Sequence, residues 1–118
     1  MNIKTEVLTK LKSCIEDSAK YIPATVDSII LFGSYARGEQ TIYSDLDIAI
    51  VRNTGVSRRS NEELNIEDML QCAFENLLEV NVFYTQTVKL EVAESEWDTN
   101  YLIKKEGKLL WSSTAILH

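Results

Sequence analysis

The sequence is poor in residues that interrupt a fold and in long apolar runs. Its 118 residues include one proline and four glycines, which argues against low-complexity or linker segments. No stretch approaches the length of a membrane-spanning helix, and the charged, amphipathic first residues are unlike a signal peptide. We therefore expect one cytoplasmic domain over residues 1–118, with no membrane-embedded part.

Cysteine and histidine are equally scarce. Cys14 and Cys72 both fall on apolar faces of expected helices, which favours buried free thiols over a disulfide or a metal-binding pair. The single histidine, His118, is terminal, and we assign it no role.

Positive charge is nearly absent from one long segment. The formal net charge is −6, and between Glu62 and Asp98 there are ten acidic residues against Lys89 alone. Binding to a long nucleic acid needs clustered lysine and arginine side chains at the phosphates. An extended nucleic acid is therefore not expected to be a direct partner.

A glycine-bounded motif follows the first apolar run, which we expect to form a strand over Val26–Phe32. The motif is Gly33-Ser34-Tyr35-Ala36-Arg37-Gly38, and it indicates a strand that leads into a short helix. Free N–H groups at the helix start, together with the Ser34 hydroxyl, would form a cradle for phosphate oxygens. Arg37 either screens triphosphate charge or makes a structural salt bridge with Glu39 or another acid, and both interpretations stay open.

A pair of aspartates opens the next expected strand, Leu46–Arg52. Strand alternation places Asp45 and Asp47 on one face and the apolar residues between and after them on the other. The two carboxylates can then converge on a small divalent ion that prefers oxygen ligands. A glycine turn or an aspartate pair alone is commonly structural. Their combination across a short spacer favours a cleft that binds both phosphate and metal.

The rest of the chain predicts a small α/β or α+β domain. Apolar spacing predicts an amphipathic helix over residues 2–20 and a second helix whose buried face contains Ile66, Met69, Leu70, Ala73, Phe74, Leu77 and Leu78. We expect a third strand at Val80–Tyr84, a helix capped by Ser95 and Asp98 that ends at Gly107, and a last strand at Leu109–Trp111. About four strands would form the sheet, with the helices packed on one face.

The two motifs carry a family resemblance. Gly33–Gly38 followed by Ser44-Asp45-Leu46-Asp47 resembles the GSxxRG…SDxD signature of polymerase-β-like nucleotidyltransferases, in particular the minimal (MNT) group. The likeness runs from about Val26 to Trp111, because the closing stretch from Lys104 is also similar to the family's ending.

The resemblance implies an activity, a metal and a partner. It implies transfer of a nucleoside monophosphate, most often AMP from ATP, with Mg²⁺ held by Asp45 and Asp47 and the outgoing phosphates held by Gly33 and Ser34. Small stand-alone members are frequently antitoxin partners of HEPN-domain toxins, and some adenylylate the toxin. A nucleotide triphosphate and a HEPN-type toxin are therefore the implied partners.

One position departs from the family pattern. The family's third carboxylate on a later strand is replaced by an amide, Asn81, which can bind a metal but cannot accept a proton as a base. Glu79, on the same expected strand face, is a possible substitute, although two residues shift it by ~7 Å. Two functions stay open: an active Mg²⁺-dependent nucleotidyltransferase, and a weak or inactive binding module that neutralises its partner by occlusion.

Overall fold

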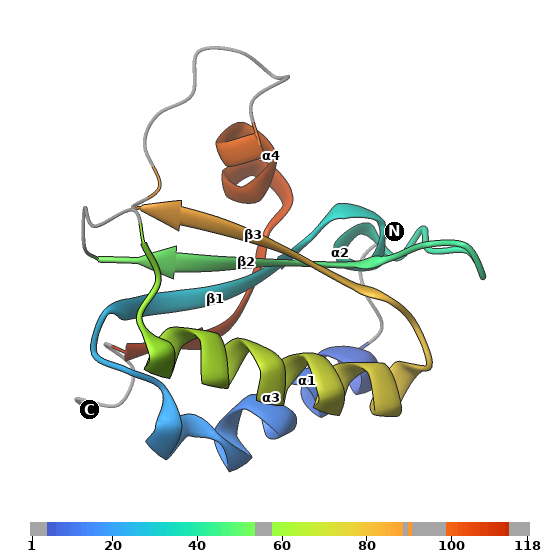
Figure 1. Cartoon of the computed structure of the whole chain (residues 1–118). Helices are drawn as coiled ribbons and strands as arrows, with labels where there is room; N and C mark the ends of the chain where they lie inside the picture. Colours follow the sequence, from blue (N-terminus) through green and yellow to red (C-terminus); the bar gives the residue numbers. More distant parts are fainter. Residues whose placement is uncertain (1–4, 54–57, 89, 91–98, 114–118) are drawn as a thin grey trace.

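A computed structural model describes residues 5–53, 58–88, 90 and 99–113, and the structural statements below concern these residues (Figure 1). In chain order the elements are helix α1 (Thr5–Asp17), 3-10 helix η1 (Ala19–Tyr21), strand β1 (Val26–Phe32), helix α2 (Gly33–Arg37), strand β2 (Leu46–Arg52), helix α3 (Asn61–Leu78), strand β3 (Val82–Val88), helix α4 (Thr99–Glu106) and strand β4 (Lys108–Ser112). The bounds of β1 and β2 match the predicted strands.

The four strands form one mixed sheet in the order β3-β2-β1-β4. β1 pairs antiparallel with β2 and with β4, whereas β2 and β3 run parallel and are connected through α3. Three register pairs matter for the site: Phe32 lies opposite Asp47, Leu31 opposite Lys108, and Asp47 opposite Phe83. The predicted α+β class with four strands is confirmed.

Helices cover both faces of the sheet. Figure 1 shows α1 and α3 together on one side of the sheet, as predicted, and α4 on the other. On the α4 side, Ile103 packs with Ile30, Phe32, Ala49 and Val51. The expectation that helices pack on one face is therefore wrong for α4. The physical reason is that the two central strands are buried on both faces, so a second layer has to cover the α4 side.

Three other expectations need correction. Met69, placed on the buried face of α3, is 41% exposed. Cys72, expected to be a buried free thiol, is free but exposed, and Cys14 is half-buried. The errors at Met69 and Cys72 have the same cause, because α3 buries a narrower stripe, centred on Ile66, Leu70 and Phe74, than its apolar residues indicated.

The third strand begins later than expected. α3 ends at Leu78 and is closed by Glu79 in the left-handed conformation (φ 56°), so the chain turns there before β3 starts at Val82. α4 ends directly before Gly107, as predicted. The predicted cap at Ser95 and Asp98 lies outside the described residues.

No described helix combines the length and the apolar character needed to cross a membrane.

A buried ion pair anchors the start of α3 to the end of β2. Arg52 donates from Nε to Glu63 Oε2 (2.5 Å) and from Nη2 to Glu63 Oε1 (3.0 Å), and both side chains are at most 5% exposed. Ser60 and Glu63 also form a reciprocal capping box. The hydrogen bonds from Arg52 are the main cause that lowers the pKa of Glu63 from 4.5 to about 2.

This ion pair predicts a pH-dependent loss of stability in Glu63→Gln. A carboxyl whose pKa is lowered by folding stabilises the protein above its ordinary pKa of 4.5, and this contribution disappears as the pH falls towards about 2. At neutral pH we expect Glu63→Gln to lower the free energy of unfolding by about 3 kcal/mol. Urea unfolding between pH 7 and pH 2 should show the gap closing, while the exposed Glu62→Gln shows none; a gap that is constant with pH would contradict the prediction.

Candidate active site

Asp47 lies in β2, and Asp45 directly precedes this strand. Leu46 and Ile48, which alternate with them, are fully buried in the core under α1 and α3. Asp45 is exposed and Asp47 is half-buried, on the side of the sheet that α4 partly covers. The alternating pattern therefore places both carboxylates on the opposite face from the main core.

The glycine turn lies directly against the second aspartate. Because Phe32 pairs with Asp47, the next residue, Gly33, reaches the Asp47 side chain. Gly33 has φ 77°, and a Cβ atom there would lie 2.2 Å from Asp47 Oδ2, closer than any side chain tolerates. The two sequence motifs thus form one site, and only glycine fits at their contact.

The pKa of Asp47 is raised from its ordinary value. Burial is the largest cause; the negative charges of Asp45 and Glu106 add to it, and Arg37 opposes it. The ionised form of the carboxyl is thus less favoured than in an isolated aspartate, and a bound cation would offset this effect. Among the described residues, no three carboxylate, imidazole or thiol groups converge on one point. Two carboxylates facing solvent suit Mg²⁺, which takes oxygen ligands and keeps positions for water or substrate phosphates.

Arg37 makes structural salt bridges. Its Nη1 donates to both carboxylate oxygens of Glu106 (2.9 Å each), and its Nε donates to Glu39 Oε2 at 3.2 Å. The sequence left open whether Arg37 screens triphosphate charge or makes a salt bridge. The structure shows salt bridges, with Glu39 and with a second acid, Glu106.

One N–H group of the expected phosphate cradle is already occupied. The N–H of Gly33 donates to Glu106 Oε1 at 3.1 Å, so the expectation of a free donor is wrong at this residue. The cause is long-range, because Glu106 lies 73 residues further along the chain. Ser34, the next residue of the turn and half-buried, stays the predicted phosphate contact.

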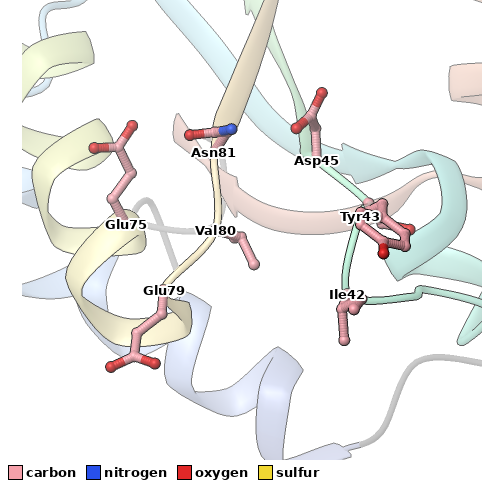
Figure 2. Close-up of a pocket in the computed structure, with 8 residues that line it drawn as sticks. Ile42, Tyr43, Asp45, Glu75, Glu79, Val80 and Asn81 are labelled. Atoms are coloured by element: carbon pink, nitrogen blue, oxygen red, sulfur yellow. The ribbon is translucent and has the colours of Figure 1, made fainter.

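Asn81 lies beside Asp45. Leu46 N–H donates to the Asn81 carbonyl oxygen at 2.9 Å, and Leu46 pairs with Val82 in the parallel ladder. Figure 2 shows the Asn81 amide and the Asp45 carboxylate at the rim of the same pocket. The amide therefore lies near Asp45, and its assignment to the family's third carboxylate position stays a prediction.

Glu79 does not replace the missing carboxylate. It caps α3 instead of lying on β3, and its carboxylate points away from Asp45 and Asn81 in Figure 2. The prediction that Glu79 shares a strand face with Asn81 is wrong, because the left-handed residue turns the chain before the strand begins.

A pocket of about 450 Å³ lies beside Asp45 and is lined by Ile42, Tyr43, Ser44, Asp45, Glu75, Glu79, Val80 and Asn81 (Figure 2). Sequence reasoning assigned nothing to its apolar wall, although Ile42 and Tyr43 are each 88% exposed. It also missed Phe83, which is 60% exposed and pairs with Asp47 in the ladder. The available signal in the sequence was the pair of apolar residues, Ile42 and Tyr43, directly before the predicted metal-binding motif.

Comparisons with known proteins identify the family of this chain. Residues 8–110 match the family model described as a nucleotidyltransferase domain. A protein of Methanocaldococcus jannaschii, whose name proposes a protein adenylyltransferase, is 35% identical over 91 residues, covering 75% of this chain and 87% of that protein. A second protein of that organism with the same proposed activity is 53% identical over 45 residues, but the match covers only 38% of this chain and 40% of that protein.

Solved structures share the fold. A toxin–antitoxin structure with AMP-PNP aligns with a TM-score of 0.53 and 22% identity, over 92% of this chain and 76% of that chain. The structure of a tri-AMPylated Shewanella oneidensis HEPN toxin with an MNT antitoxin aligns with a TM-score of 0.51 and 17% identity, over the same shares. The family model spans most of the chain and one relative is similar over three quarters of it. The chain therefore belongs to the nucleotidyltransferase domain family.

Proposed function

We propose that this chain is a Mg²⁺-dependent nucleotidyltransferase that transfers AMP from ATP to a partner protein, the HEPN-type toxin of a toxin–antitoxin pair. The observation that carries the proposal is the contact between the Gly33 turn and the Asp47 carboxylate, which joins a phosphate-binding motif to a metal-binding motif. The names of the M. jannaschii relatives support a protein acceptor. The likeness to an MNT antitoxin bound to an AMPylated HEPN toxin supports the choice of partner.

The reaction is a displacement at phosphorus. The acceptor hydroxyl oxygen forms a bond to the α-phosphorus of ATP, the bond to the β-phosphate oxygen breaks, and pyrophosphate leaves. The hydroxyl proton passes to a base or to water. Negative charge grows on the phosphoryl oxygens and on the leaving group, so the site has to supply positive charge and hydrogen-bond donors at these atoms.

Each motif has a distinct part in this reaction. Asp45 and Asp47 would hold Mg²⁺, which supplies Lewis-acid stabilisation of the phosphate charge when bound. The Ser34 hydroxyl, at the start of α2, would orient the leaving phosphates. Gly33 presents no side chain, so the Asp47 carboxylate can lie against the turn where the triphosphate would bind.

A second candidate function is a binding module that neutralises its partner by occlusion. Asn81 is the observation that favours it, because the amide beside Asp45 cannot take the acceptor proton. The two candidates differ in one measurable quantity, the rate of AMP transfer.

The aspartate pair predicts the loss of metal-dependent nucleotide binding. Asp45→Ala and Asp47→Ala each remove one of the two carboxylates that converge on this face, so the Mg²⁺-dependent part of the ATP affinity should disappear. Calorimetry with and without Mg²⁺ measures this quantity. Asp17→Ala, at an exposed position of α1 on the other side of the sheet, is the control. Equal affinity in wild type and both site variants would exclude the proposed metal site.

The glycine contact predicts that Gly33→Ala disables the site. The new Cβ would collide with Asp47 Oδ2, and Ala also disfavours the left-handed φ of 77°. Gly38→Ala is the matched control, because Gly38 has a similar φ of 72° at the end of α2. Both variants should lose about 1 kcal/mol of stability from backbone strain, but only Gly33→Ala should lose Mg²⁺-dependent ATP binding. Loss of binding in both would assign the effect to strain alone.

The amide at the third position predicts slow transfer that can be improved. General-base assistance contributes ~10²- to 10⁴-fold, so wild type should transfer AMP slowly and Asn81→Asp should raise the rate. Glu79→Gln should have no effect, since its carboxylate points away from the site. Single-turnover transfer of labelled AMP onto the cognate toxin tests this set. Rapid wild-type transfer with no gain in Asn81→Asp would show that the base lies elsewhere, and no transfer with intact binding would favour occlusion.

A further inference from the structure

We propose that Glu106, the last residue of α4, is a positioning residue of the nucleotide site, and that it holds the Gly33 turn in the arrangement that receives the triphosphate. This inference rests on the proposed function. It assigns a role at the site to a residue that lies outside both sequence motifs.

The Glu106 carboxylate connects two groups of the turn. It accepts the Gly33 N–H at 3.1 Å and both hydrogen bonds from Arg37 Nη1 at 2.9 Å. The Glu106 side chain is 15% exposed, so the ion pair with Arg37 is shielded from water on the carboxylate side. Hydrogen bonds to an ionised, largely buried acceptor are stronger than those between neutral groups. One side chain therefore holds both the first and the last residue of α2.

The strand register explains how Glu106 reaches the turn. Lys108, the first residue of β4, pairs with Leu31, two residues before Gly33. The preceding Gly107 packs so closely that a Cβ atom there would lie 2.7 Å from Ile30 Cγ2 and 2.2 Å from the Ile103 carbonyl oxygen. The absence of a side chain at Gly107 lets the end of α4 approach β1, which places Glu106 beside the turn.

The helix that carries Glu106 is fixed to the sheet. α4 is anchored by its residue Ile103, which is 2% exposed and packs against the two central strands, β1 and β2. The Gly107 N–H also donates to the Ile103 carbonyl oxygen at 2.9 Å. The backbone at the end of α4 is thus fixed beside the turn, and the Glu106 carboxylate accepts hydrogen bonds from Gly33 and Arg37 there.

The effect of Glu106 reaches the metal-binding residue through Gly33. The Gly33 backbone lies against the Asp47 carboxylate with no space for a Cβ atom, so a shift of the turn moves atoms that touch Asp47. A small displacement of a site of this kind has large effects on binding. Loss of the Glu106 charge should therefore weaken nucleotide binding without changing the surface that meets the acceptor.

Glu106→Gln tests the proposal, because it keeps the shape of the side chain and removes the charge. We expect the Kd for ATP with Mg²⁺ to rise ~10-fold, as for the loss of a hydrogen bond to a charged group, with the KM for the acceptor unchanged. The backbone amide NMR signal of Gly33 should also shift in the protein without nucleotide. Glu106→Asp, which is one methylene shorter, should restore the charge but not the affinity.

Glu39→Gln is the matched control. Glu39 is the other carboxylate bound by Arg37, but its side chain is 56% exposed, and the Gly33 N–H donates to Glu106. Its Kd should equal that of wild type. An unchanged Kd in Glu106→Gln, or an equal effect in Glu39→Gln, overturns the role of Glu106 and leaves the proposed function standing. Tighter ATP binding in Glu106→Gln also overturns it, by showing that the carboxylate competes with phosphate. A wild-type chain that binds no ATP overturns the proposed function and this inference together.

Discussion

The contact between Gly33 and the Asp47 carboxylate is the constraint on which the site depends. It follows from the antiparallel register of β1 and β2, which sets Phe32 opposite Asp47 and leaves no space for a Cβ atom at the next residue. A glycine turn at the start of a short helix and a strand that carries acidic side chains are each common in proteins. Because the two lie in van der Waals contact here, the proposed triphosphate and metal sites are adjacent.

The acidic side chains around this contact fall into two groups, one that is paired with an arginine and one that is not. Glu106 is neutralised by Arg37, whose own pKa is raised mainly by its hydrogen bond to Glu106. Asp45 and Asp47 form no ion pair among the described residues, and the pKa of Asp47 is raised by burial and by Asp45. The charge of Glu106 is thus balanced within the fold, whereas the absence of a salt bridge at Asp45 and Asp47 among the described residues fits their proposed role in holding a metal ion.

The third position shows that the geometry of a site can be kept while its chemistry changes. Asn81 directly precedes β3 and lies beside Asp45 through the parallel pairing of β2 and β3, so an amide oxygen is available there. Compared with a carboxylate, the amide lacks one negative charge and cannot accept a proton. In the proposed function, phosphate and metal are held by residues next to β1 and β2. We therefore expect nucleotide binding to tolerate the amide better than AMP transfer does.

Local pattern alone was enough to give the exact bounds of β1 and β2, the placement of Asp45 and Asp47 on one face, and the end of α4 before Gly107, because alternation and glycine preferences act over a few residues. It was not enough for the start of β3, the second helical layer, the exposure of Cys72 or the contact of Glu106 with Gly33. These features depend on which elements pack together, and the last joins residues 73 positions apart. No periodicity in the sequence predicts a contact between residues so far apart. The pairing of β4 with β1 brings them together.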